Sequence, residues 1–122
     1  MRMFSFGPEA GRHVDRHGSD FRLSRLAHTQ GIHVACLYLG PGGLVDYHPA
    51  ATYQLFAVIA GDGWVRAEGA ERVSIRAGQA AFWRSGERHE AGTDAGMTAL
   101  VIETDALGGD PMAIGPAPST GD

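Results

Sequence analysis

The chain has 122 residues, of which 43% are hydrophobic and 20% charged, and its formal net charge is -4. This length fits one domain with a single core, and no apolar run reaches the roughly 20 residues that a membrane-spanning helix needs. All ten basic residues are arginines spread along the chain, so no basic stripe favours a nucleic acid partner.

The predicted elements begin with a short strand at the start of the chain, where Phe4 and Phe6 alternate around Ser5. This strand would add to the sheet of this chain or to that of a neighbouring subunit. Residues 7–18 mix Gly, Pro and charge and are expected to be irregular. From there the 18 glycines break the sequence into short apolar runs, which favours strands over helices. The predicted strands are 20–26, 32–39, 45–48, 54–60, 63–67, 72–75, 80–83, 89–92 and 97–103.

Glycine-rich turns separate these strands. The run Gly40-Pro41-Gly42-Gly43 ends one strand, and Gly61-Asp62-Gly63 predicts a tight hairpin between strands 54–60 and 63–67. Hairpins imply antiparallel pairing, and so many strands in one small domain close on themselves because an open sheet exposes its edges. We therefore predict an all-β jelly-roll barrel over residues 1–105, followed by a flexible tail over 106–122.

The strand that begins at Gln54 is apolar on both faces. Gln54, Phe56 and Val58 share one face because side chains alternate along a strand. A strand buried on both sides has its inner face in the barrel and its outer face against a second sheet or subunit, which favours a homodimer. A polar Gln54 on such a strand must find a partner.

Two histidines lie on separate predicted strands. His89 begins one strand, and His48 ends another just before Pro49, which holds the backbone of His48 extended. If the inner faces converge, His48, Gln54 and His89 meet at one mouth of the barrel. Two imidazoles and an amide oxygen are suitable ligands for a divalent transition metal. The other histidines are weaker candidates: His13, His17 and His28 are expected to be exposed, and His33 lies either in the core or at the mouth.

The glycine and histidine spacing resembles the two signature motifs of the cupin superfamily. In the first motif a glycine precedes two histidines, a glutamate and a second glycine, and this chain has Gly42, His48, Ala50, Gln54 and Gly61 there. In the second motif the corresponding residues are Gly78, Arg84, Gly86, His89 and Thr93. The resemblance implies a conical jelly-roll barrel, usually dimeric, with a metal or small-molecule site at its mouth. It does not imply one activity, because cupins include dioxygenases, isomerases, epimerases, decarboxylases, storage proteins and ligand-sensing domains.

Two departures from the motif weaken the implied metal site. Ala50 replaces the second histidine, and Gln54 replaces the glutamate that would supply negative charge. Iron, zinc, nickel or manganese held by His48, Gln54 and His89 would keep its full charge and favour an anionic substrate or a carboxylate ligand. The alternative is a hydrogen-bonded polar cluster that binds no metal. Additional oxygen donors for the site would come from Glu87, Glu90 or Glu103.

Around this site we predict a pocket for a small organic molecule. The residues assigned to it are Tyr47, Phe56, Val58, Phe82 and Arg84. Three functions remain open: a metal-dependent oxygenase or isomerase, a non-catalytic metabolite-binding module, and a metal-independent isomerase or epimerase using Tyr47 or Tyr53 with His48. The single Cys36 is expected to be a buried apolar residue, and a cytoplasmic location fits its lack of a disulfide partner.

Overall fold

The computed structural model describes residues 1–107. These residues form a nine-stranded antiparallel sheet and two single-turn helices, and none of the helices in this range could cross a membrane. The elements in chain order are η1 (Pro8–Ala10), β1 (Arg12–Val14), β2 (Phe21–Thr29), β3 (Ile32–Leu39), β4 (Leu44–Pro49), β5 (Gln54–Ala67), β6 (Val73–Arg76), β7 (Ala80–Trp83), β8 (Arg88–Gly92), β9 (Met97–Thr104) and η2 (Asp105–Leu107).

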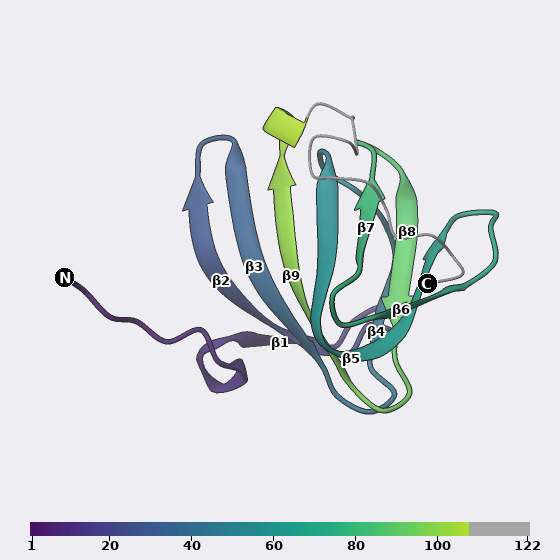
Figure 1. The fold of residues 1–122 in the computed structure, drawn as a ribbon, viewed down its shortest axis with the longest axis horizontal. Coiled ribbons are helices and arrows are strands. Elements are labelled where there is room, and N and C mark those ends of the chain that lie inside the picture. Colours follow the sequence, from purple (N-terminus) through teal and green to yellow (C-terminus); the bar gives the residue numbers. More distant parts are fainter. Residues whose placement is uncertain (108–122) are drawn as a thin grey trace.

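The sheet curls into a barrel that is wider at one end. Its strand order is β1-β2-β3-β9-β5-β8-β4, with β6 and β7 also paired to β5. Figure 1 shows β2, β3, β9 and the start of β5 spreading apart at the upper end and converging at the lower end. Backbone hydrogen bonds between Asp20 and Leu44 link β4 to the start of β2. The predicted all-β jelly-roll architecture is therefore confirmed.

The longest strand corrects one prediction. Residues 61–63 form no hairpin; β5 runs without interruption through them, pairing first with β9 and then with β8. Gly61 has a φ of 74°, and a Cβ there would meet the carbonyl oxygen of Gly96 at 2.2 Å. The register with β9 shifts between Val58 and Ala60. Glycine at this point thus lets one strand bend from one wall of the barrel into the other, which a local turn signal cannot distinguish from a hairpin.

The strand predicted at the N-terminus does not form within this chain, and its addition to a neighbouring subunit stays a prediction. Residues 1–6 form no strand, and Phe4 is 72% exposed. The first strand is instead β1, within the segment expected to be irregular, where it pairs with β2. In Figure 1 the first residues extend away from the barrel. β9 ends at Thr104, and residues 108–122 of the predicted tail lie outside the described residues, so the domain boundary at residue 105 stays a prediction.

The barrel interior is filled by apolar side chains from both walls. Phe56 and Val58 on β5 are each 2% exposed, and Ala99 on β9 is fully buried. Cys36 on β3 is also fully buried, as predicted, and no other cysteine is present in the chain. The alternation along each strand therefore sends one row of apolar side chains inward, and this row ends in polar residues toward the wide end.

Candidate functional site

A cavity of about 400 Å³ lies inside the barrel between its two walls. Its apolar lining comes from several strands of both walls and includes Phe21, Leu37, Phe56, Ala91 and Val101. The polar lining residues on β3, β4, β5, β8 and β9 include His33, Asp46, His48, Gln54, His89 and Glu103, and Arg16, His17 and Ser19 from the segment before β2 line the cavity as well. An apolar cavity with a few convergent polar groups is the usual form of a small-molecule site.

His48 and His89 form a close pair in this cavity. They are cross-strand partners on β4 and β8, and their ring centroids are 4.3 Å apart with the planes tilted by 59°. The Nδ1–H of each ring donates to the backbone carbonyl two residues earlier: His48 to Asp46 at 2.9 Å, and His89 to Glu87 at 3.0 Å. These bonds fix the tautomer, so each Nε2 carries a lone pair that is available to a ligand.

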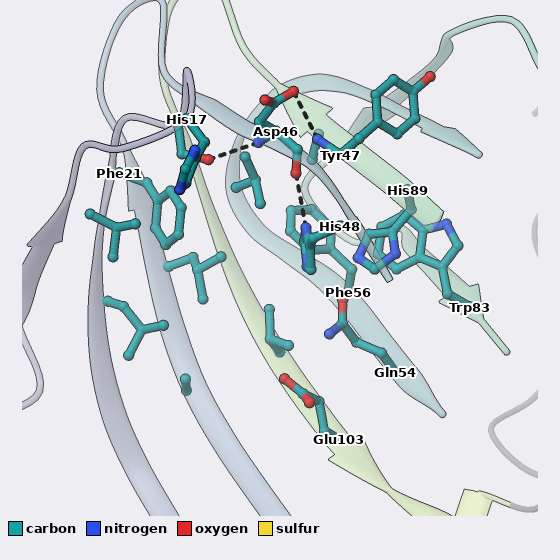
Figure 2. Close-up of a pocket in the computed structure, with 18 of the residues that line it drawn as sticks. His17, Phe21, Asp46, Tyr47, His48, Gln54, Phe56, Trp83, His89 and Glu103 are labelled. Carbon is teal, nitrogen blue, oxygen red and sulfur yellow. Dashed lines mark hydrogen bonds between the residues drawn. The ribbon is translucent and has the colours of Figure 1, made fainter. Parts of the chain in front are cut away.

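The residues just before the two histidines hold them in place. The backbone N–H of Asp46 donates to Ser19 Oγ, and its own Oδ1 accepts from the N–H of Tyr47 (Figure 2). On the other strand, Glu87 Oε1 accepts from the backbone N–H of Arg84. Both carbonyls that receive the imidazole protons therefore belong to residues that are themselves fixed by side-chain hydrogen bonds.

His89 is the more buried of the pair, with 2% of its surface exposed. Its ring stacks on Trp83 at a centroid distance of 4.0 Å, and its Nε2 has no hydrogen-bond partner among the described residues. Burial lowers the pKa of His89 from 6.5 to about 4, opposed by the hydrogen bond to Glu87 and assisted by the neighbouring His48. His89 is therefore a neutral imidazole at pH 7.

This lowered pKa predicts a loss of stability in acid. Below pH 6.5 the unfolded chain binds a proton at His89 that the folded chain does not bind until about pH 4, so protonation favours unfolding. Between pH 7 and pH 5 the free energy of unfolding should fall by about 2 kcal/mol from this group. Denaturant titrations at both pH values check it, with His89→Gln expected to lose that part of the pH dependence. An unchanged dependence in the variant would contradict the assignment.

Gln54 lies in a row of polar residues across three strands. It is the cross-strand partner of Glu103 on β9, which is in turn the partner of His33 on β3. Gln54 is 6% exposed, and no side-chain hydrogen bond satisfies its carboxamide within residues 1–107. The Nε2 of His33 is likewise buried without a partner. In Figure 2 the Gln54 and Glu103 side chains extend into the same space as His48.

The structure brings together most of the residues that the sequence assigned to the site. His48, Gln54 and His89 all border one cavity, together with Tyr47 and Phe56. Four consecutive residues of β4, 45–48, border it because the register with β8 shifts between Val45 and His48, which breaks strict alternation. The described residues contain no group of three or more His, Cys, Asp or Glu side chains arranged to hold a metal ion.

Three assigned pocket residues lie elsewhere. Val58 is buried but lies further along β5, and Arg84 is exposed in the turn after β7. Phe82 faces away from the cavity and stacks with Tyr53, while Trp83, the next residue, lines the cavity. The sequence shows that these two neighbours face opposite ways, but only the pairing of Gln54 with Trp83 decides which one points inward.

Sequence reasoning did not assign His17 to the pocket and left Glu103 as one of three alternatives. His17 was expected to be exposed, and it is, yet it also borders the cavity and has a φ of 57°. Glu103 was named as one of three alternative oxygen donors; of these, only Glu103 lines this cavity among the described residues, since Glu90 is buried in an ion pair with Arg66. The register of β9 against β5 is the signal that selects it.

The tyrosines are not arranged to act with His48. Figure 2 shows the Tyr47 hydroxyl extending away from the His48 ring, and the guanidinium of Arg66 lies 5.0 Å from the Tyr47 ring. Tyr53 stacks with Phe82 outside the cavity. The arrangement therefore favours binding through imidazole and amide groups over acid-base chemistry by a tyrosine and His48.

Comparisons with known proteins give the fold. The sequence matches no family model, and no curated protein sequence matches it. A cupin-like protein from Thermotoga maritima is similar in structure, with a TM-score of 0.73 and 17% identity over 84% of this chain and 83% of that one. A Cupin 2 conserved barrel domain protein from Salinispora arenicola has a TM-score of 0.71 and 19% identity over 93% and 97%.

A third similar structure is a predicted oxalate decarboxylase from Thermotoga maritima, with a TM-score of 0.71 and 18% identity over 83% of this chain and 98% of that chain. Other similar structures are described as having a double-stranded β-helix. At these identities the likeness shows the fold alone.

Proposed function

We propose that this chain, which has the cupin fold, binds a small organic molecule in the cavity beside His48 and His89. The observation that carries the proposal is an apolar cavity bordered by polar atoms without partners. Its volume of about 400 Å³ is within the range of known ligand sites. The apolar walls would cover the body of the ligand, and the free Nε2 of His48 and the carboxamide of Gln54 would bind its polar group.

Ligand binding predicts a thermal shift that depends on the cavity. In a screen of small metabolites with chelator present, at least one compound should raise the melting temperature, because a ligand at 100 times its Kd stabilises by about 2.7 kcal/mol. Ala91→Leu would fill part of the cavity and should reduce this shift. Ala70→Leu, at an exposed turn, is the matched control. A library without any stabilising compound, or an equal shift in both variants, would count against the proposal.

A divalent metal ion held by His48, Gln54 and His89 is the second candidate. The two fixed tautomers favour it, because neutral imidazole Nε2 atoms and an amide oxygen are donors that suit iron, zinc, nickel or manganese. These three ligands supply no negative charge. The motif has a further histidine where this chain has Ala50, which is 2% exposed and has no side-chain atom that can bind a metal. A bound metal would polarise an oxygen of the ligand. Metal content by elemental analysis, with and without His89→Ala, separates the two candidates.

The homodimer stays a prediction. Ile59 on the outer face of β5 is 54% exposed, and Phe4 and Met3 are exposed in the N-terminal segment. An apolar outer face of this kind favours association with a second copy. The molar mass in solution checks it.

A further inference from the structure

We propose that the ligand of this cavity carries a positively charged amine group, which the carboxylate of Glu103 binds. The inference rests on the proposed small-molecule site and names the chemical class that this site would select. It follows from where Glu103 lies and from what surrounds it.

The Glu103 carboxylate has no ion-pair partner. It borders the cavity and is half-buried, but no arginine or histidine nitrogen in residues 1–107 lies within 4.0 Å of its oxygens. Its cross-strand neighbours are His33 on one side and Gln54 on the other, and neither side chain hydrogen-bonds to it. A cationic group of a ligand could therefore form a charge-assisted hydrogen bond with this carboxylate without displacing a partner that the described residues supply.

The other charged groups of the cavity leave it negative. Arg16 and Asp46 also line it, and their formal charges cancel, so the carboxylate of Glu103 remains as the net charge. His89 is neutral at pH 7 and adds no positive charge. The Nε2 of His48 is an acceptor, and the Gln54 carboxamide can accept through its oxygen as well as donate through its amino group. Arg16 is a donor at this cavity, so the groups that favour a hydrogen-bond donor on the ligand are the Glu103 carboxylate and the His48 Nε2.

Aromatic walls support the same class of ligand. Phe56 and Trp83 line the cavity and pack edge to face at 5.6 Å. Aromatic faces attract an ammonium group through the ring quadrupole, and this attraction increases where water is excluded. An amine with a small apolar body would therefore match the carboxylate, the acceptors and the walls together.

The test compares three probes with a similar body: 2-phenylethylamine, 2-phenylethanol and 3-phenylpropanoate. Affinities are measured by calorimetry at pH 7 with chelator present. The amine should bind at least about tenfold more tightly than the alcohol, and the carboxylate most weakly. In Glu103→Gln the amine should lose about tenfold in affinity while the alcohol keeps its own.

Two further variants make the result specific. Glu103→Asp keeps the charge and should recover part of the amine affinity, and Glu71→Gln, which removes an exposed carboxylate outside this cavity, should leave all three affinities unchanged. Tighter binding of the carboxylate probe, or amine affinity that is insensitive to Glu103→Gln, overturns the inference while leaving a small-molecule site. Failure of all three probes to bind also overturns the inference, while the thermal-shift library with Ala91→Leu decides the proposed function separately.

Discussion

Gly61→Ala is expected to lower the free energy of unfolding by about 3 kcal/mol. The backbone of Gly61 is left-handed, with a φ of 74°, and this conformation costs a residue with a Cβ about 1–2 kcal/mol. The added Cβ would also meet the carbonyl oxygen of Gly96 at 2.2 Å, which forces the β5–β9 pairing apart. Thermal and denaturant unfolding measure the loss, which should lower the melting temperature by roughly 10–20 °C.

Two other glycines separate the cost of the left-handed backbone from the cost of the close approach. Gly86 has a similar φ of 82° but nothing within 4 Å of an added Cβ, so Gly86→Ala should cost only about 1 kcal/mol. Gly63 has no left-handed φ, yet a Cβ there would lie 2.2 Å from the oxygen of Gly92. A small effect of Gly61→Ala, equal to that of Gly86→Ala, would show that the close approach at the bend of β5 is not needed.

Arg66→Met is expected to destabilise the fold by about 3–5 kcal/mol. Arg66 on β5 pairs with Glu90 on β8, with Nη2 and Oε1 2.8 Å apart. The Glu90 side chain is only 7% exposed, so removing the guanidinium leaves a buried carboxylate without its partner. The guanidinium also lies over the Tyr47 ring, and this contact would be lost as well. Denaturant unfolding of the purified variants measures the effect.

The control for this pair lies on the same two segments of chain. Arg88 pairs with Glu68 at 2.6 Å, but their side chains are 49% and 61% exposed. Arg88→Met should therefore cost less than about 1 kcal/mol, as exposed ion pairs do. The double variant Arg66→Met with Glu90→Leu should recover most of the lost stability, because it leaves no buried charge. Equal losses in Arg66→Met and Arg88→Met would contradict the importance of burial.

Much of the fold could be predicted from local patterns. Glycines at short intervals and alternating apolar residues mark strands wherever they occur, because both signals act within a few residues of chain. For β3 (Ile32–Leu39) and β7 (Ala80–Trp83) the predicted bounds equal those observed. The cupin fold implied by the motif resemblance is confirmed by the similar structures. The bend at Gly61 could not be predicted in this way, since a glycine in a hairpin and a glycine in a bent strand have the same local signal.

For the candidate site, the sequence alone identified His48, Gln54 and His89 as inward residues of separate strands, because strand alternation and Pro49 constrain each of them locally. Only the tertiary structure decided that Trp83 rather than Phe82 lines the cavity. It also decided that Glu103 lies beside Gln54, with His33 on the other side of Glu103. The register between strands that are far apart in the chain sets these neighbours. That register depends on the packing of the whole barrel, so no short stretch of sequence determines it.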